Sequence, residues 1–124
     1  MRVLIADDEP LFADALEVLL VADGRIEVVG TARNGREAVA LAHDLQPDLV
    51  LMDLSMPGLD GFAATAQILD GAGRVRVLVL TGSDDPADVA KARSAGAVGY
   101  ITKDQIAETL VDTILAAGAD GAEG

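Results

Sequence analysis

Residues 48–61 read DLVLMDLSMPGLDG, an apolar run of strand length that ends at Asp53 and continues into a tight, glycine-bearing loop. A strand of aliphatic residues is typical of a parallel sheet that helices cover on both faces. Asp53 taken alone could be an ordinary residue at the end of a strand. Because ligands bind at the carboxyl edge of such sheets, the loop that follows makes Asp53 a candidate site residue.

Four further apolar runs of similar length predict, with this one, five strands: Arg2–Ala6, Ile26–Ala32, Leu49–Asp53, Val75–Thr81 and Val98–Thr102. Segments of helical period separate them, and we expect five helices near Pro10–Val21, Asn34–Leu45, Asp60–Leu69, Pro86–Gly96 and Asp104–Ala117. Strands that alternate with helices indicate a parallel sheet with right-handed crossovers. Five such units in 124 residues fit an α/β fold with a doubly wound sheet in the order 2-1-3-4-5, as in flavodoxin.

Several residues mark the predicted helix ends. Asn34, followed three residues later by Glu37, resembles a capping box. Asp60 is suited to cap the third helix, and Pro86 is suited to the first position of the fourth. Gly96 is expected to end that fourth helix, because glycine adopts the left-handed conformation of a C-cap without strain.

The composition describes one domain with an aliphatic core. Of the 124 residues 51% are apolar, whereas only Phe12, Phe62 and Tyr100 are aromatic. The formal net charge of -12 argues against direct contact with nucleic-acid phosphates, which requires clustered lysine and arginine. The absence of cysteine excludes disulfides, thiolate metal sites and cysteine catalysis.

We expect a soluble, cytoplasmic protein that does not enter a membrane. Asp7 interrupts the first apolar run after four residues, and no run reaches the length of a membrane span. Residues 1–117 are expected to form the domain. Residues 118–124, GADGAEG, are expected to be a flexible tail or the start of a linker.

Polar residues end or directly follow four of the predicted strands, so a parallel sheet would bring them to one edge. They are Asp7 and Asp8, Asp53, Thr81, and Lys103. Three carboxylates, a hydroxyl and an ammonium group at one place need a divalent cation and an anion for charge balance. Oxygen ligands of this kind suit Mg²⁺, or Mn²⁺ in its place. A carboxylate held by such a cation can attack phosphorus, which makes Asp53 a candidate phosphoryl acceptor.

Each of these residues also has an ordinary interpretation. Asp7 and Asp8 could be a turn and helix-capping pair, Thr81 could reflect β-propensity, and Lys103 could be a surface lysine. The loop after Asp53 could turn the Ser55 carbonyl toward the same metal.

Taken together, the residues Asp7-Asp8, Asp53 with Met56-Pro57-Gly58-Leu59-Asp60-Gly61, Thr81-Gly82 and Lys103 resemble the receiver domain of two-component response regulators. The resemblance covers the chain from Arg2 to about Ala117 and implies the CheY-like version of the fold. It implies that Asp53 is the phosphoacceptor and that Mg²⁺ binds Asp8, Asp53 and the Ser55 carbonyl, with Asp7 acting through water. It also implies that Thr81 and Lys103 contact the phosphoryl oxygens, and that Tyr100 swings inward when Thr81 moves.

Residues 99–104, GYITKD, are similar to the NarL/FixJ class, whose members carry a C-terminal helix-turn-helix DNA-binding domain. Asp104 stands where many receivers have proline, which removes an expected cis peptide bond. The chain could therefore be a receiver taken from a longer transcription regulator, or a stand-alone receiver that acts through protein contacts.

The resemblance implies a sensor histidine kinase as partner and a phosphorylation-dependent homodimer, with DNA contacted only through a further domain. Dimerisation is expected around the fourth helix, fifth strand and fifth helix. We expect no enzyme, but a phosphoacceptor that assists its own phosphorylation and dephosphorylation.

Other interpretations fit the sequence less well. An aspartyl-phosphate phosphatase of the haloacid-dehalogenase type would need a second aspartate at the position of Ser55. A nucleotide or flavin site would need a glycine-rich loop after the first strand, where Asp7 and Asp8 would repel phosphates. His43, beside Asp44 in a predicted helix, is interpreted as a solvated residue without a phosphorelay role.

Overall fold

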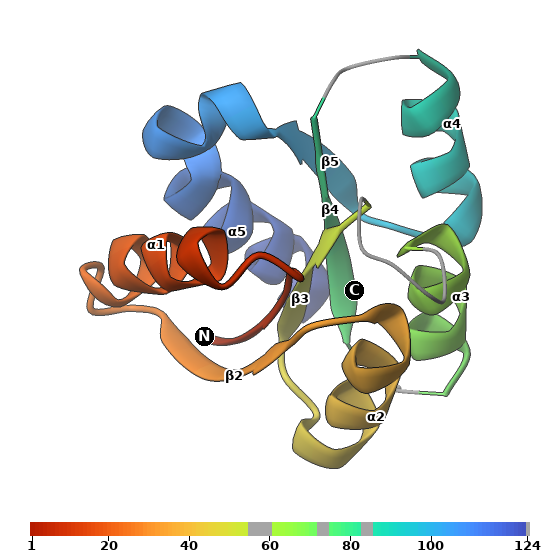
Figure 1. Cartoon of the computed structure of the whole chain (residues 1–124), viewed down its shortest axis with the longest axis horizontal. Coiled ribbons are helices and arrows are strands. Elements are labelled where there is room, and N and C mark those ends of the chain that lie inside the picture. Colours follow the sequence, from red (N-terminus) through yellow and green to blue (C-terminus); the bar gives the residue numbers. More distant parts are fainter. Residues whose placement is uncertain (55–60, 72–74, 83–85, 124) are drawn as a thin grey trace.

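The computed structural model describes residues 1–54, 61–71, 75–82 and 86–123, which form a parallel sheet between two layers of helices (Figure 1). The five strands are β1 (Arg2–Ala6), β2 (Glu27–Ala32), β3 (Leu49–Asp53), β4 (Arg76–Thr81) and β5 (Gly99–Thr102). All neighbouring strands pair in parallel, in the order β2-β1-β3-β4-β5. The predicted fold class and strand order are therefore confirmed.

The helices are α1 (Pro10–Val21), α2 (Gly35–Leu45), α3 (Gly61–Gly71), α4 (Pro86–Ala95) and α5 (Ile106–Glu123), with a 3₁₀ turn at Lys103–Gln105. Helices α1 and α5 cover one face of the sheet, and α2, α3 and α4 cover the other (Figure 1). Within the described ranges, no helix combines the length and apolar character that crossing a bilayer requires.

The ends of several elements differ slightly from those predicted. Strands β2, β4 and β5 each begin one residue later, and α3 continues two residues further, to Gly71. Helix α5 begins at Ile106 because the preceding residues form the 3₁₀ turn. Its backbone is helical to Glu123, where a flexible tail was expected. The division of the chain after residue 117 stays a prediction.

Two of the predicted helix ends are capped by hydrogen bonds, although Glu37 bonds the amide one residue before the one that a capping box uses. Asn34 Oδ1 accepts from the Glu37 amide at 2.8 Å, and the Glu37 carboxylate accepts from the Arg33 amide at 3.1 Å. Gly96 has a φ of +101° and donates to the Arg93 carbonyl, while the next amide reaches back to Ala92. This pair of bonds is the Schellman motif that glycine favours. The proposed cap at Asp60 lies outside the described residues.

The core is aliphatic on both faces of the sheet, as the composition predicted. All five residues of β3 are buried. On the α1–α5 face the core includes Leu16, Leu20, Leu110 and Ile114, whereas on the other face small alanines of α2, α3 and α4 pack against the strands. Burial on both faces holds the carboxyl ends of the central strands rigidly in place.

A bulge shifts the register between β1 and β2. Val3 pairs with Val28, but Leu4 pairs with Gly30, so that Val29 is the additional residue. A side chain at Gly30 would lie 3.2 Å from the Leu45 Cδ1 atom, which explains the glycine. Beyond the bulge the ladder continues to Asp7, whose amide donates to the Ala32 carbonyl at 2.9 Å.

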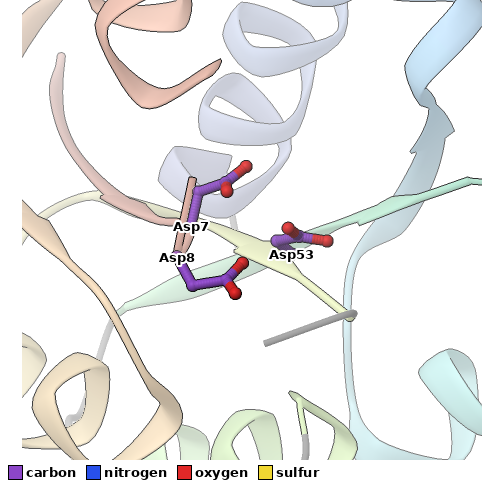
Figure 2. A group of neighbouring side chains, drawn as sticks. All are labelled: Asp7, Asp8 and Asp53. Atoms are coloured by element: carbon purple, nitrogen blue, oxygen red, sulfur yellow. The ribbon is translucent and has the colours of Figure 1, made fainter. Parts of the chain in front are cut away.

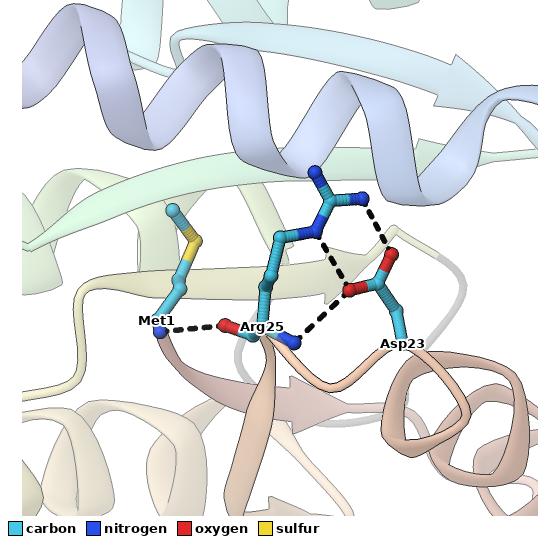
Figure 3. Close-up of polar contacts among 3 residues, drawn as sticks. All are labelled: Met1, Asp23 and Arg25. Carbon is cyan, nitrogen blue, oxygen red and sulfur yellow. Dashed lines mark hydrogen bonds and ion pairs between the residues drawn. The ribbon is translucent and has the colours of Figure 1, made fainter.

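The opposite end of β1 lies beside the turn that connects α1 to β2 (Figure 3). The Met1 amino group donates to the Arg25 carbonyl at 2.8 Å. The Arg25 side chain donates twice to the Asp23 carboxylate, at 2.9 and 2.6 Å. These bonds lower the pKa of Asp23 to about 2.

Candidate functional site

The carboxyl ends of four strands bring the predicted site residues to one edge of the sheet. Asp7 and Asp8 follow β1, Asp53 ends β3, Thr81 ends β4, and Lys103 follows β5. Among them, Asp7, Asp8, Asp53 and Lys103 form a compact polar cluster. We call these four residues the acidic pocket.

The three carboxylates of the acidic pocket lie close together (Figure 2). One oxygen from each lies within 4.8 Å of the others. Asp7 and Asp53 are 2% and 1% exposed, and Asp8 is the more accessible of the three. Carboxylates so close together repel, so this geometry requires positive charge to balance it.

Asp7 is held by the backbone of the turn before α1. Its Oδ1 atom accepts from the Glu9 amide at 2.9 Å, while its Oδ2 atom is buried without a hydrogen-bond partner among the described residues. Burial raises the pKa of Asp7 to about 6, and the Asp53 carboxylate adds to the increase. The Glu9 amide and the Lys103 charge act in the opposite direction and lower this pKa.

Lys103 supplies positive charge to the pocket from the 3₁₀ turn between β5 and α5. Its Nζ atom donates to Asp53 Oδ2 at 3.2 Å. The side chain of Lys103 is 31% exposed and that of Asp53 is 2% exposed. The ion pair therefore joins a buried anion to a cation that retains access to solvent.

Phe12 is a residue of this site that the sequence did not identify. The Lys103 Nζ atom lies 4.8 Å from the centre of its ring. Its position two residues after Pro10 places it in the first turn of α1, beside the acidic pocket. No sequence pattern predicts this contact, because only the fold brings α1 next to the residue after β5.

The other predicted residues in the described part of the chain are located by their burial and their positions on the strands. Thr81 is 5% exposed at the end of β4 and pairs with Thr102 of β5. Tyr100 is half-buried on β5 and packs against the core under α4. Ser55 and the loop at residues 55–60 lie outside the described residues. The roles of Thr81, Tyr100 and Ser55 stay predictions.

The residues of the acidic pocket fit a hard divalent cation. Carboxylates from Asp7, Asp8 and Asp53 supply the oxygen ligands that such ions prefer. The unpartnered Asp7 oxygen leaves room for a further hydrogen bond, for example from a water on the metal. Beside them, Lys103 offers a cation for an anionic group that arrives at Asp53.

Comparison with known families agrees with this geometry. The family model described as "Response regulator receiver domain" matches residues 3–115. The chain belongs to this family. It is a receiver domain of the two-component response regulators, and the predicted resemblance is confirmed.

Curated relatives of this receiver domain include regulators of the LuxR/NarL type. The transcriptional regulatory protein LnrK of Bacillus subtilis is 38% identical over 98% of this chain, and the match covers 55% of its own length. The response regulator protein VraR of Staphylococcus aureus is 39% identical over 92% of this chain and 54% of its own length. The receiver domain thus spans about half the length of the curated relatives it matches.

Solved structures share the whole fold. The signal receiver domain of a NarL response regulator from Mycobacterium tuberculosis has a TM-score of 0.91 and 35% identity, over 95% of both chains. The response regulator domain of CheB from Thermotoga maritima has a TM-score of 0.90 and 32% identity, over 96% of both chains.

Proposed function

We propose that this receiver domain accepts a phosphoryl group on Asp53 from a sensor histidine kinase. One observation carries the proposal: Asp53 is 1% exposed at the end of β3, with Lys103 Nζ at 3.2 Å and the carboxylates of Asp7 and Asp8 beside it. Membership in the receiver family supports the same assignment. The carboxylate is thereby fixed in orientation and paired with a cation that can follow the incoming phosphoryl group.

In the proposed transfer, an Asp53 oxygen attacks the phosphorus of a phosphohistidine. An oxygen–phosphorus bond forms, the nitrogen–phosphorus bond breaks, and the imidazole leaves with the bonding electrons. The Lys103 ammonium turns from Asp53 to a phosphoryl oxygen and balances its charge. The hydroxyl of Thr81 donates a hydrogen bond to another phosphoryl oxygen.

Asp7, Asp8 and Asp53 would hold Mg²⁺, or Mn²⁺ in its place, together with the Ser55 carbonyl. When bound, the ion withdraws charge from the phosphoryl oxygens and offsets the repulsion among the carboxylates. Burial and the nearby Asp53 charge raise the pKa of Asp7, and the charge of a bound cation would act in the opposite direction.

The proposed consequence is a change of surface rather than turnover of a substrate. Movement of Thr81 and Tyr100 would alter the face formed by α4, β5 and α5 and favour a homodimer. DNA would be contacted through a further domain, as the description of LnrK as a transcriptional regulatory protein suggests for a relative. Ser55 stands where a phosphatase would have its acid–base aspartate, so we propose no enzymatic turnover beyond the protein's own phosphate.

Intact-mass measurement after incubation with acetyl phosphate and Mg²⁺ tests the proposal. We expect the mass of one phosphoryl group to be added to the wild type, and none to Asp53→Asn or in the presence of a chelator. Asp44→Asn, at an exposed carboxylate of α2, is the matched control and should still be phosphorylated. Phosphorylation of Asp53→Asn would show that another residue is the acceptor.

A further inference from the structure

The Lys103 ammonium group has two close neighbours of different chemistry. The Asp53 carboxylate accepts its hydrogen bond at 3.2 Å, and the Phe12 ring lies 4.8 Å from the same nitrogen. A cation at this distance from an aromatic ring is attracted by the negative charge above the face of the ring. The ammonium therefore has a second favourable contact besides its salt bridge.

Phosphorylation would affect the Asp53 carboxylate and the Phe12 ring differently. A phosphoryl group on Asp53 would convert that carboxylate to an acyl phosphate and move the negative charge to the phosphoryl oxygens, so the salt bridge would change. The Phe12 contact involves no atom that reacts. It would therefore persist while the ammonium turns toward a phosphoryl oxygen.

The Phe12 ring packs against the core, whereas the Lys103 side chain reaches toward solvent. Phe12 is half-buried against the core on the α1–α5 face, which includes Ile101 and Ile106 on either side of Lys103. Lys103 itself lies in a short 3₁₀ turn, and its side chain has several rotatable bonds and partial access to solvent. A ring packed against the core offers the ammonium group a second contact that does not depend on Asp53.

From this arrangement we propose that Phe12 is a positioning residue for phosphoryl transfer, which holds the Lys103 ammonium in the acidic pocket before and after its bond to Asp53 changes. The inference rests on the proposed role of Asp53 and goes beyond it. In this proposal Phe12 acts through Lys103 and takes no part in the bonds that form and break.

The rate of phosphorylation by acetyl phosphate with Mg²⁺ tests the role of the ring. Phe12→Leu keeps an apolar side chain but removes the aromatic face, and we expect phosphorylation to slow by about threefold to tenfold. Phe12→Tyr keeps the face and should remain within about twofold of the wild type. In a Lys103→Met background, Phe12→Leu should have no further effect, because the ammonium is already absent.

A stability control separates positioning from packing. Leu19→Ala removes core packing from the same helix at a site further along α1, and the folded variant should be phosphorylated at the wild-type rate. Equal rates in Phe12→Leu and the wild type would overturn the inference. The same would follow if Phe12→Tyr were as slow as Phe12→Leu, or if the loss persisted without the lysine.

A second measurement does not depend on phosphorylation. In the unmodified protein, the Lys103 Hε protons should show an upfield NMR shift from the ring, which Phe12→Leu removes and Leu19→Ala keeps. If the wild type accepts no phosphoryl group, the proposed function fails, while this shift still decides whether Phe12 positions Lys103. Absence of the shift in the wild type would overturn the inference by itself.

Discussion

The carboxyl group of Asp7 is 2% exposed, and within the described part of the chain only one of its oxygens is hydrogen-bonded. At neutral pH it is ionised, although burial and the Asp53 charge favour the protonated form and raise its pKa to about 6. The site thus keeps an anion in a place that destabilises the metal-free fold. Electrostatic destabilisation of this kind is expected where a residue serves binding rather than stability.

Replacing Asp7 by asparagine should stabilise the metal-free protein at pH 7. The folded-state pKa of about 6 exceeds the ordinary value of 3.8, so the folded protein binds the proton more tightly than the unfolded chain does. The stability of the wild type should therefore fall as the pH rises from about 4 to about 6, by at most about 3 kcal/mol. Asp7→Asn should not lose stability over this pH range. Urea unfolding of both proteins at pH 4 and pH 7 measures the change in the free energy of unfolding of each.

Mg²⁺ should reverse the order of stability of the wild type and Asp7→Asn. We expect it to raise the free energy of unfolding of the wild type at pH 7 and to have a much smaller effect on Asp7→Asn. Asp14→Asn, at an exposed position of α1, should respond to Mg²⁺ as the wild type does. A metal-free Asp7→Asn protein less stable than the wild type at pH 7 would contradict the assigned cause of the raised pKa.

Helix α2 ends at a contact that comes from a distant part of the chain. The Arg2 guanidinium donates to the carbonyls of Leu45 and Gln46, both at 2.9 Å. The last carbonyls of a helix lack partners within the helix, so the side chain acts as a C-cap. Gln46 itself has a φ of +47°, which ends the helical path.

Changing Arg2 to lysine should therefore destabilise the fold, although the charge is kept. Both bonds come from the Nη1 atom, which the planar guanidinium holds in a fixed orientation, whereas a lysine ammonium is a point charge on a flexible stem. We expect a loss of about 0.5–1.5 kcal/mol in the free energy of unfolding. Arg36→Lys is the control, because Arg36 is exposed on α2 and has no hydrogen bond or ion pair within the described residues. Equal stability of the two variants would show that the cap contributes nothing.

Gly96 at the end of α4 should tolerate no side chain. Its φ is +101°, and an added Cβ atom would lie 2.7 Å from Leu69 Cδ1 of α3. Gly96→Ala should cost about 1–3 kcal/mol in the free energy of unfolding, which thermal unfolding would detect as a lower Tm. Gly24→Ala has nothing within 4 Å of the new Cβ and should change stability little. A neutral Gly96→Ala would mean that α4 can end in another way.

The predicted ends of helices and strands are correct where a local sequence feature determines them. The limits of β1, β3 and α1 agree with the prediction, because an uninterrupted apolar run or a proline marks each. The start of α5 was wrong by two residues, since a 3₁₀ turn holding Lys103 precedes it. No local pattern in KDQI distinguishes such a turn from the first turn of an α-helix.

In the whole molecule, the parallel topology brings the site residues to one edge of the sheet. Packing between elements then determines which of their side chains touch. The sequence could predict that Asp7, Asp53 and Lys103 share one edge, because a parallel sheet requires it. It could not predict which carboxylate pairs with Lys103, nor that the Phe12 ring lies beside it. Those contacts depend on side-chain directions across elements that are distant in the chain.

Phosphorylation should convert the domain to a dimer despite its charge. The formal net charge is -12, and a phosphoryl group makes it more negative, so electrostatic repulsion opposes self-association. Dimerisation would therefore have to come from new contacts on a surface that phosphorylation changes. Size exclusion with light scattering should show a larger dimer fraction at about 0.3 M than at about 0.05 M salt, because salt screens the repulsion. Asp53→Asn treated in the same way should stay monomeric, and a dimer in that variant would sink the proposed switch.

The sparse aromatic content of the core has a practical consequence. Tyr100 is the single tyrosine of the chain, and the chain has no tryptophan. It is half-buried on β5, whose last residue adjoins Lys103. Tyrosine absorbance, near-ultraviolet circular dichroism and fluorescence thus report on one known position without any label. A shift in that signal on addition of acetyl phosphate would follow the change in this strand in real time.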